Sequence, residues 1–166
     1  MAAKPDYGSY KKLVEPFVFY GSYHAHPMNQ LVHIIFVPTI VLTALVFFSY
    51  LKLESIFPAV ASSSFAPYLS ADVPVALGYA GYYIYLCPNA VGFSGAFLVM
   101  TALLASQAYV SAVGSIAWVP AIALHILSWI LQVHVGHTIY EKRAPALLDN
   151  LAQVSSPLAS SLHHVS

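Results

Sequence analysis

"FYGSYHAHPMNQLVHIIFVPTIVLTALVFF", residues 19–48, joins a histidine-rich segment to a long apolar run. The run continues to residue 51 and contains no Asp, Glu, Lys or Arg. About 20 such residues are enough for a helix to cross the ~30 Å hydrocarbon core of a bilayer. The stretch therefore predicts a transmembrane helix with imidazole groups gathered at its start.

The composition of the whole chain is typical of a membrane protein. Of 166 residues, 59% are hydrophobic and 7% are charged, whereas soluble domains carry about 25% charged residues. Most of the outer surface is therefore expected to face lipid. The net charge is zero and no basic stripe is present, which argues against nucleic acid as a partner. The single cysteine, Cys87, excludes an internal disulfide and a cysteine-based metal cluster.

Apolar runs predict an all-α integral membrane bundle of about four transmembrane helices. The expected spans are residues 31–51, 72–87, 90–112 and 115–136. Small residues on the second and third spans are expected to let these helices approach closely. These residues are Gly78, Gly81, Gly92, Gly95 and Ala96.

The domain organisation is expected to be simple. We expect residues 1–154 to form one membrane domain and residues 155–166 to form a flexible tail. His163 and His164 lie in this tail and have no expected role. The Ser/Pro-rich segment 52–71 is interpreted as a connector between spans. Residues 1–17 lack the apolar core of a cleavable signal peptide, so the first span is expected to act as the targeting signal.

The distribution of basic residues predicts the orientation. Five of the six Lys and Arg residues flank the outer ends of the first and fourth spans. They are Lys4, Lys11, Lys12, Lys142 and Arg143. Because positive residues favour the cytosolic side, both termini are expected there.

Two histidine clusters stand at these outer ends. His24, His26 and His33 lie at the start of the first span, and His134 and His137 lie at the end of the fourth. In a four-span bundle these two ends lie on the same side of the membrane. The clusters can therefore meet in space although about 100 residues separate them.

Residues three and four apart share one face of a helix, and both clusters contain such spacings. The members are His26, Asn29 and His33 in one cluster and His134, His137 and Glu141 in the other. Imidazole with a carboxylate suits iron, zinc or copper, and open positions on iron suit oxygen chemistry. We therefore expect a transition-metal site, in which Asn29, Gln132 and Glu141 fix the histidine tautomers. His125, in the middle of the fourth span, is expected to pack or hydrogen-bond instead.

Two longer motifs occupy the ends of the chain. The first is Tyr20-x3-His24-x-His26-Pro27-x-Asn29-x3-His33-x4-Pro38, and the second is Trp129-x2-Gln132 followed by Gly136-His137-x3-Glu141 and KRAPALLDN (142–150). Together they resemble the signatures of the Mpo1-like family of small membrane proteins, and the resemblance extends over residues 6–153. Between the motifs only hydrophobicity is similar.

The resemblance implies a specific activity. Members of this family are dioxygenases of the endoplasmic reticulum membrane that need ferrous iron, Fe2+. They act in the α-oxidation that follows phytosphingosine breakdown, where O2 is used to shorten a 2-hydroxy fatty acid by one carbon and CO2 is released. The substrate chain would then lie between apolar helices, with its polar head at the metal.

The resemblance also implies roles for particular residues. His24, His33 and His137 are the strongest candidates for metal ligands, and His26 and His134 complete the candidate set. Tyr20, Asn29 and Glu141 are the candidate catalytic or supporting residues.

Two features depart from the family pattern. Position 26 is His where the family has Asn, and residues 132–137 are one residue longer than the usual spacing. A π-bulge is expected to absorb the extra residue and to place His134 in the site.

Three other functions are compatible with the sequence. One is an oxygenase of the same family that acts on another lipid or a terpenoid-like substrate. Another is a haem protein with two facing histidines as axial ligands. The third is a non-enzymatic scaffold or transporter in which the histidines sense pH or relay protons.

Overall fold

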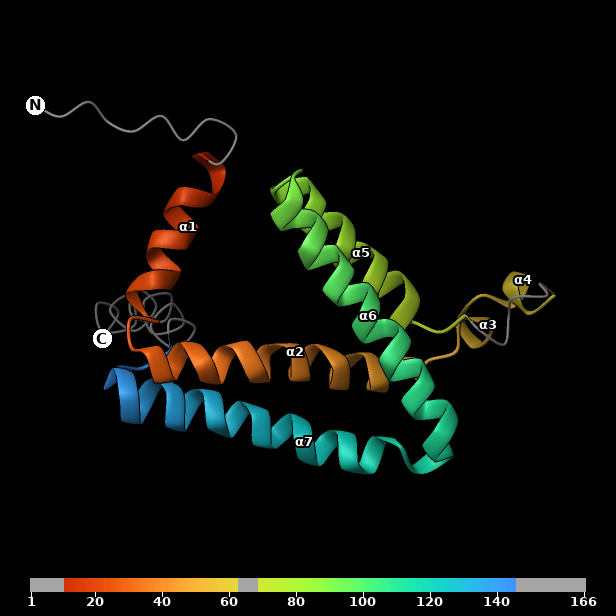
Figure 1. Ribbon diagram of the computed structural model, residues 1–166. Coiled ribbons are helices and arrows are strands. Elements are labelled where there is room, and N and C mark those ends of the chain that lie inside the picture. The colour runs from red at the N-terminus through yellow and green to blue at the C-terminus, as the bar shows by residue number, and fades with distance from the viewer. Residues whose placement is uncertain (1–10, 63–68, 146–166) are drawn as a thin grey trace, which may run out of the picture.

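The computed structural model describes residues 11–62 and 69–145 (Figure 1). Its helices are α1 (Lys11–Ser22), α2 (Pro27–Ser49), α3 (Leu53–Ile56), α4 (Pro58–Ala61), α5 (Asp72–Leu86), α6 (Ala90–Val113), the 3₁₀ turn η3 (Gly114–Ile116), α7 (Trp118–Ile130) and the π-helix η4 (Leu131–Glu141). Lys4, His163, His164 and the expected tail 155–166 lie outside the described residues.

The predicted all-helical membrane fold is confirmed. Within the described ranges, three helical segments are long and apolar enough to cross a membrane, namely Pro27–Ser49, Ala90–Ile116 and Trp118–Glu141. The second expected span, residues 72–87, forms α5, which has 15 residues. At 1.5 Å per residue α5 extends about 22 Å, which is shorter than the hydrocarbon core.

The long helices form two antiparallel pairs (Figure 1). Helix α2 lies beside α7 and η4, and α5 packs along α6, which also crosses α2. Helix α1 ends beside the start of α2, at the end of the pair where η4 finishes, whereas α3 and α4 lie at the opposite end. The end of α1, the start of α2 and the end of η4 therefore meet.

A small apolar core joins the two helix pairs. Leu45 of α2 packs with Ala76 of α5 and with Val99 and Leu103 of α6. These four side chains are at most 6% exposed, so they hold α2 against both α5 and α6.

Two of the four expected packing glycines serve the α5–α6 contact. A Cβ at Gly92 would overlap the backbone carbonyl of Cys87, and one at Gly95 would lie 3.0 Å from the Tyr83 ring. Nothing lies within 4 Å of the corresponding position at Gly78 or Gly81. The prediction is therefore wrong for these two residues, because they face away from neighbouring elements.

His125 ties α7 to α2, which confirms its expected hydrogen-bonded role. The Trp129 indole donates to Nε2 of His125 at 3.2 Å, so this nitrogen is the acceptor. Nδ1 then carries the proton and donates to Thr43 Oγ1 at 2.7 Å. Both ring nitrogens are satisfied within the helix pair.

The expected π-bulge is present and extends over the whole of η4. The helix ends at Lys142, which has a left-handed backbone (φ 53°) and donates its N–H to the carbonyl of His137. The wider π turn sets which side chains of η4 face α2.

Candidate metal centre

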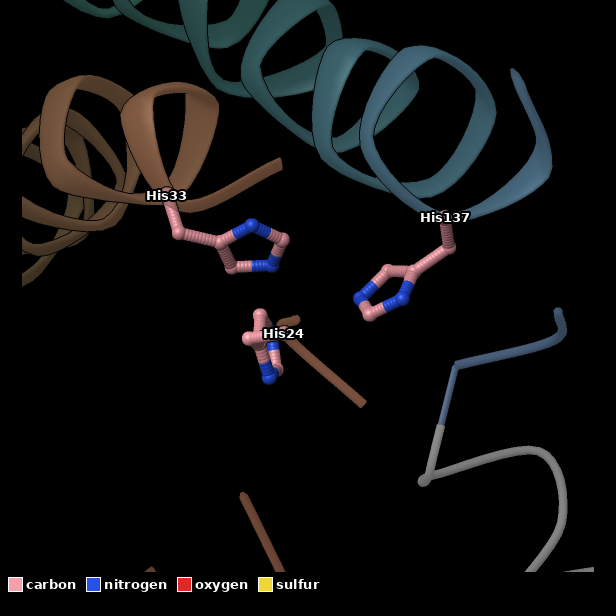
Figure 2. Close-up of side chains that lie close together, drawn as sticks. All are labelled: His24, His33 and His137. Atoms are coloured by element: carbon pink, nitrogen blue, oxygen red, sulfur yellow. The ribbon is translucent and has the colours of Figure 1, made fainter. Parts of the chain in front are cut away.

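Three imidazoles from three segments converge where α1, α2 and η4 meet. His24 follows α1, His33 lies in α2 and His137 lies in η4 (Figure 2). One ring nitrogen of each lies within 4.8 Å of the others. The ring centroids are 4.4 Å apart for His24–His33 and 5.0 Å apart for both pairs with His137. The cluster can hold one metal ion.

The end of α1 orients His24. Nδ1 of His24 lies 2.8 Å from the carbonyl oxygen of Tyr20. Since a carbonyl only accepts, Nδ1 carries the proton and Nε2 keeps its lone pair. Nε2 is buried and receives no hydrogen bond from any described residue. The Tyr20 ring stacks on the imidazole, with centroids 3.9 Å apart, so the ring of His24 is held on two sides.

His33 is oriented in the same way. Its Nδ1 donates to the carbonyl of Asn29 at 3.0 Å, which leaves Nε2 as the lone-pair nitrogen. Metal-binding histidines usually donate their other N–H to a carbonyl or carboxylate in this manner. In two of the three rings, the carbonyl four residues earlier in the chain thus leaves Nε2 with a lone pair that can bind a metal ion.

His137 reaches the cluster because the residue before it has no side chain. A Cβ at Gly136 would overlap Asn29 Oδ1 and lie 3.4 Å from Cε1 of His33. Only glycine therefore lets η4 approach α2 this closely. His137 is 4% exposed, and its Nδ1 is buried with no hydrogen-bond partner among the described residues.

Glu141 connects the three segments around the cluster. Its Oε1 accepts from the backbone N–H of His26 at 2.7 Å and from Nδ2 of Asn29 at 3.0 Å. The Asn29 amide also donates to the carbonyl of Tyr23 at 3.1 Å, and the side chain is fully buried. These bonds fix the α1–α2 connection against the end of η4.

Arg143 closes the same junction, a role that the sequence did not suggest. Its guanidinium lies 3.6 Å from the centroid of the Tyr23 ring, and Nη1 donates to the carbonyl of Ser22 at 3.4 Å. Arg143 is 120 residues away from Tyr23 in sequence, so no spacing pattern could indicate the contact. Basic charge alone suggested only a topological role.

Comparison with known proteins shows the family of the chain. Residues 10–161 match the family described as 2-hydroxy-palmitic acid dioxygenase Mpo1-like. The chain belongs to this family. The 2-hydroxy-palmitic acid dioxygenase MPO1 of Saccharomyces cerevisiae is 33% identical over 135 residues, which cover 81% of this chain and 68% of the yeast protein. No solved structure matches the chain.

His26, the first departure from the Mpo1-like pattern, lies outside the cluster. It is the N-cap of α2, with an extended backbone, and its Nδ1 accepts from the N–H of Met28 at 3.1 Å. Its ring stacks on Tyr140. His26 therefore caps α2 and is not part of the three-histidine set.

His134, the candidate linked to the extra residue in the Mpo1-like pattern, is exposed and lies outside the cluster. Residues three apart share a face in an α-helix, but the wider turn of η4 rotates His134 away from His137. Gln132 is buried and donates to the Ser128 carbonyl of its own helix. The tautomers of His24 and His33 are therefore fixed by backbone carbonyls and not by Gln132, Asn29 or Glu141 side chains.

The donor set fits a transition-metal ion of the kind that a dioxygenase of this family implies. Three neutral imidazole nitrogens suit iron, zinc or copper. Three protein ligands leave coordination positions for other molecules. The buried Nε2 of His24 has no other partner among the described residues, and a metal ion would satisfy it.

Proposed function

We propose that this protein is an Fe(II)-dependent dioxygenase that shortens 2-hydroxy fatty acids by one carbon. The observation that carries the proposal is the convergence of His24, His33 and His137 at the polar end of a membrane helix. Membership of a family described by a 2-hydroxy-palmitic acid dioxygenase supports the substrate class.

The proposed reaction balances without a further reductant. A 2-hydroxy acid, R–CH(OH)–COOH, and O2 give R–COOH, CO2 and H2O. The bond between the first two carbons breaks, the carboxyl carbon leaves as CO2, and the hydroxyl-bearing carbon becomes the new carboxyl carbon. The two carbons together lose the four electrons that O2 accepts. Ferrous iron, when bound, supplies the activation of O2 and open positions for ligands.

The protein's own residues orient the reactants. His24, His33 and His137 would hold the ion through neutral nitrogens. The sequence suggested Asn29 and Glu141 as catalytic residues. In the structure, the Glu141 carboxylate accepts from the backbone N–H of His26 and from the Asn29 amide, which also donates to the carbonyl of Tyr23. We assign them to positioning the histidine-bearing segments.

Tyr20 also has a positioning role in this proposal. It stacks on His24 and its carbonyl sets the tautomer of that ring. Burial raises the pKa of the Tyr20 phenol, a group that is protonated at neutral pH even at its ordinary pKa. The phenol is thus kept as a neutral packing surface beside the ion.

The arrangement of the histidines favours a non-haem ion. A haem iron offers two axial positions to the protein, whereas three imidazoles converge here. The scaffold hypothesis predicts no tightly bound metal, so metal content separates it from the dioxygenase.

The proposed location is the endoplasmic reticulum membrane, with the metal centre at the cytosolic face. Five of the six basic residues lie in the sequence near the outer ends of the first and last long spans. By the positive-inside rule, these ends face the cytosol.

The test begins with iron content and absorbance of the detergent-purified full chain, kept anaerobic and iron-replete. We expect roughly one iron per chain with no Soret band, because one three-histidine site is present. A His24→Ala/His137→Ala variant should lose the iron, whereas His134→Ala, at an exposed position, should keep it. Addition of 2-hydroxyhexadecanoic acid and O2 should then yield pentadecanoic acid and CO2. Wild-type protein that binds no iron would refute the proposal.

A further inference from the structure

An apolar cavity of about 350 Å³ lies between α2, the end of α5 and the first half of α6. This volume lies within the range of small-molecule binding sites, about 300–1,000 Å³. Its α2 wall is formed by Val37, Pro38 and Val41, and its α6 wall includes Gly95 and Leu98. The lining is almost wholly hydrocarbon, so the cavity suits an alkyl chain and no polar ligand.

The α2 wall of the cavity begins one helical turn after His33. Val37 lies four residues after His33 on α2, which places both side chains on one side of the helix. One helical turn, about 5.4 Å, separates them along the axis. From the histidines, the α2 wall of the cavity therefore leads away from the polar end and into the apolar part of the span.

A second apolar cavity, of about 160 Å³, continues this path. It lies between α2, α5 and α6 and shares Val41 and Val99 with the first cavity. Its far end on α2 is Phe48. From His33 to Phe48 the helix rises about 22 Å. Two opposed acyl chains fill the ~30 Å hydrocarbon core of a bilayer, so this path is longer than the half of the core that one acyl chain fills.

We infer that the larger cavity binds the hydrocarbon chain of the 2-hydroxy acid, and that long chains pass between Val41 and Val99 into the smaller one. The inference rests on the proposed function and adds the site that selects chain length. The carboxylate and hydroxyl remain at the histidine end, where α2 begins. Packing along α2 removes the apolar surface of the alkyl chain from water. This packing orients the head group of the acid toward the ion.

Photolabelling tests the site without turnover. The full chain in phosphatidylcholine nanodiscs, loaded with Fe(II) and kept anaerobic, is irradiated with 2-hydroxyhexadecanoic acid that carries a terminal diazirine. We expect label on residues lining the two cavities, and a loss of label when unmodified 2-hydroxyhexadecanoic acid is added. A phosphatidylcholine with a diazirine on its acyl chain serves as the control for membrane lipid.

Substitution at the passage tests the selection of chain length. Val41→Phe should close the passage between the two cavities. The ratio of kcat/KM for 2-hydroxyhexadecanoic acid to kcat/KM for 2-hydroxyoctanoic acid should therefore fall at least about tenfold. Val119→Phe makes the same change at an exposed position of α7 and should leave this ratio unchanged. Retained iron content in both variants shows that the metal centre is intact.

The outcomes separate the chain site from the proposed function. Label on the exposed face of α7, or cavity label from the lipid probe that 2-hydroxyhexadecanoic acid does not displace, would overturn the inference. An unchanged chain-length ratio in Val41→Phe would do the same. Displaceable cavity label without production of CO2 in the wild type would support the chain site and refute the reaction.

Discussion

At the scale of single residues, the metal centre depends on carbonyl groups as much as on side chains. His24 and His33 each donate Nδ1–H to the carbonyl four residues earlier, which leaves Nε2 as the lone-pair nitrogen. Among the described residues, the side chains of Glu141 and Asn29 form no hydrogen bond with these ring nitrogens. Their hydrogen bonds instead hold the backbone segments that supply the carbonyls.

This division of tasks predicts different effects for two substitutions of Glu141. Glu141→Ala removes the acceptor for the His26 N–H and for the Asn29 amide. Loss of such supporting bonds typically weakens metal affinity 10- to 100-fold, and we expect about that loss of Fe(II) affinity in an anaerobic titration. Glu141→Gln keeps an oxygen acceptor at the same place and should restore most of the affinity. Equal affinity of Glu141→Ala and wild type would show that the network does not position the ligands.

Spacing alone placed five histidines near the site, whereas the resemblance to the Mpo1-like family ranked His24, His33 and His137 first, and these three converge. His24, His33 and His137 meet because the two chain segments end at the same side of the helix pair, which topology predicts. His26 caps α2 from outside the helix, so helical spacing does not apply to it. His134 turns away because η4 is a π-helix, and sequence spacing alone does not give the width of a turn.

At the scale of elements, the close approach of η4 to α2 depends on Gly136. Gly136→Ala would press a methyl group into Asn29 Oδ1, where the Asn29 side chain is fully buried and fixed by two donated hydrogen bonds. Overpacking of this kind costs about 1–3 kcal/mol. We expect a lower unfolding temperature in detergent and weaker Fe(II) binding, because η4 carries His137.

The matched control is Gly78→Ala in α5. Nothing lies within 4 Å of the added Cβ, and alanine stabilises a helix interior by about 0.5–1 kcal/mol relative to glycine. The unfolding temperature should therefore stay the same or rise, with Fe(II) affinity unchanged. A similar loss of stability in both variants would show that helix propensity, and not the contact with Asn29, explains the Gly136 effect.

The sequence predicted the helices better than their contacts. The first expected span, residues 31–51, forms a helix that starts at Pro27 and ends at Ser49, because hydropathy does not detect the His26 cap. The extra residue before Gly136 correctly indicated a π-helix, since its cause is local. Gly78 and Gly81 were misplaced because composition does not tell which face of α5 meets α6.

At the scale of the whole molecule, the fold brings two chain segments about 100 residues apart to one end of the helix pair. Antiparallel pairing of α2 with α7 and η4 places the start of one beside the end of the other (Figure 1). The hydrogen bond from His125 to Thr43 joins α7 to α2 away from the histidine end. The convergence of the three histidines is thus a consequence of topology, and local contacts set their final orientation.

The proposed orientation of this fold in the membrane gives the last prediction. In a Cys87→Ser background, which removes the single cysteine, Ala144→Cys reports on the histidine end and Ser55→Cys on the opposite end, where α3 lies (Figure 1). Both positions are exposed. Because basic residues favour the cytosol, a membrane-impermeant maleimide should label Ala144→Cys in sealed microsomes and Ser55→Cys only after permeabilisation. The reverse labelling would place the metal centre in the lumen. Substrate would then have to reach the site from the lumenal leaflet.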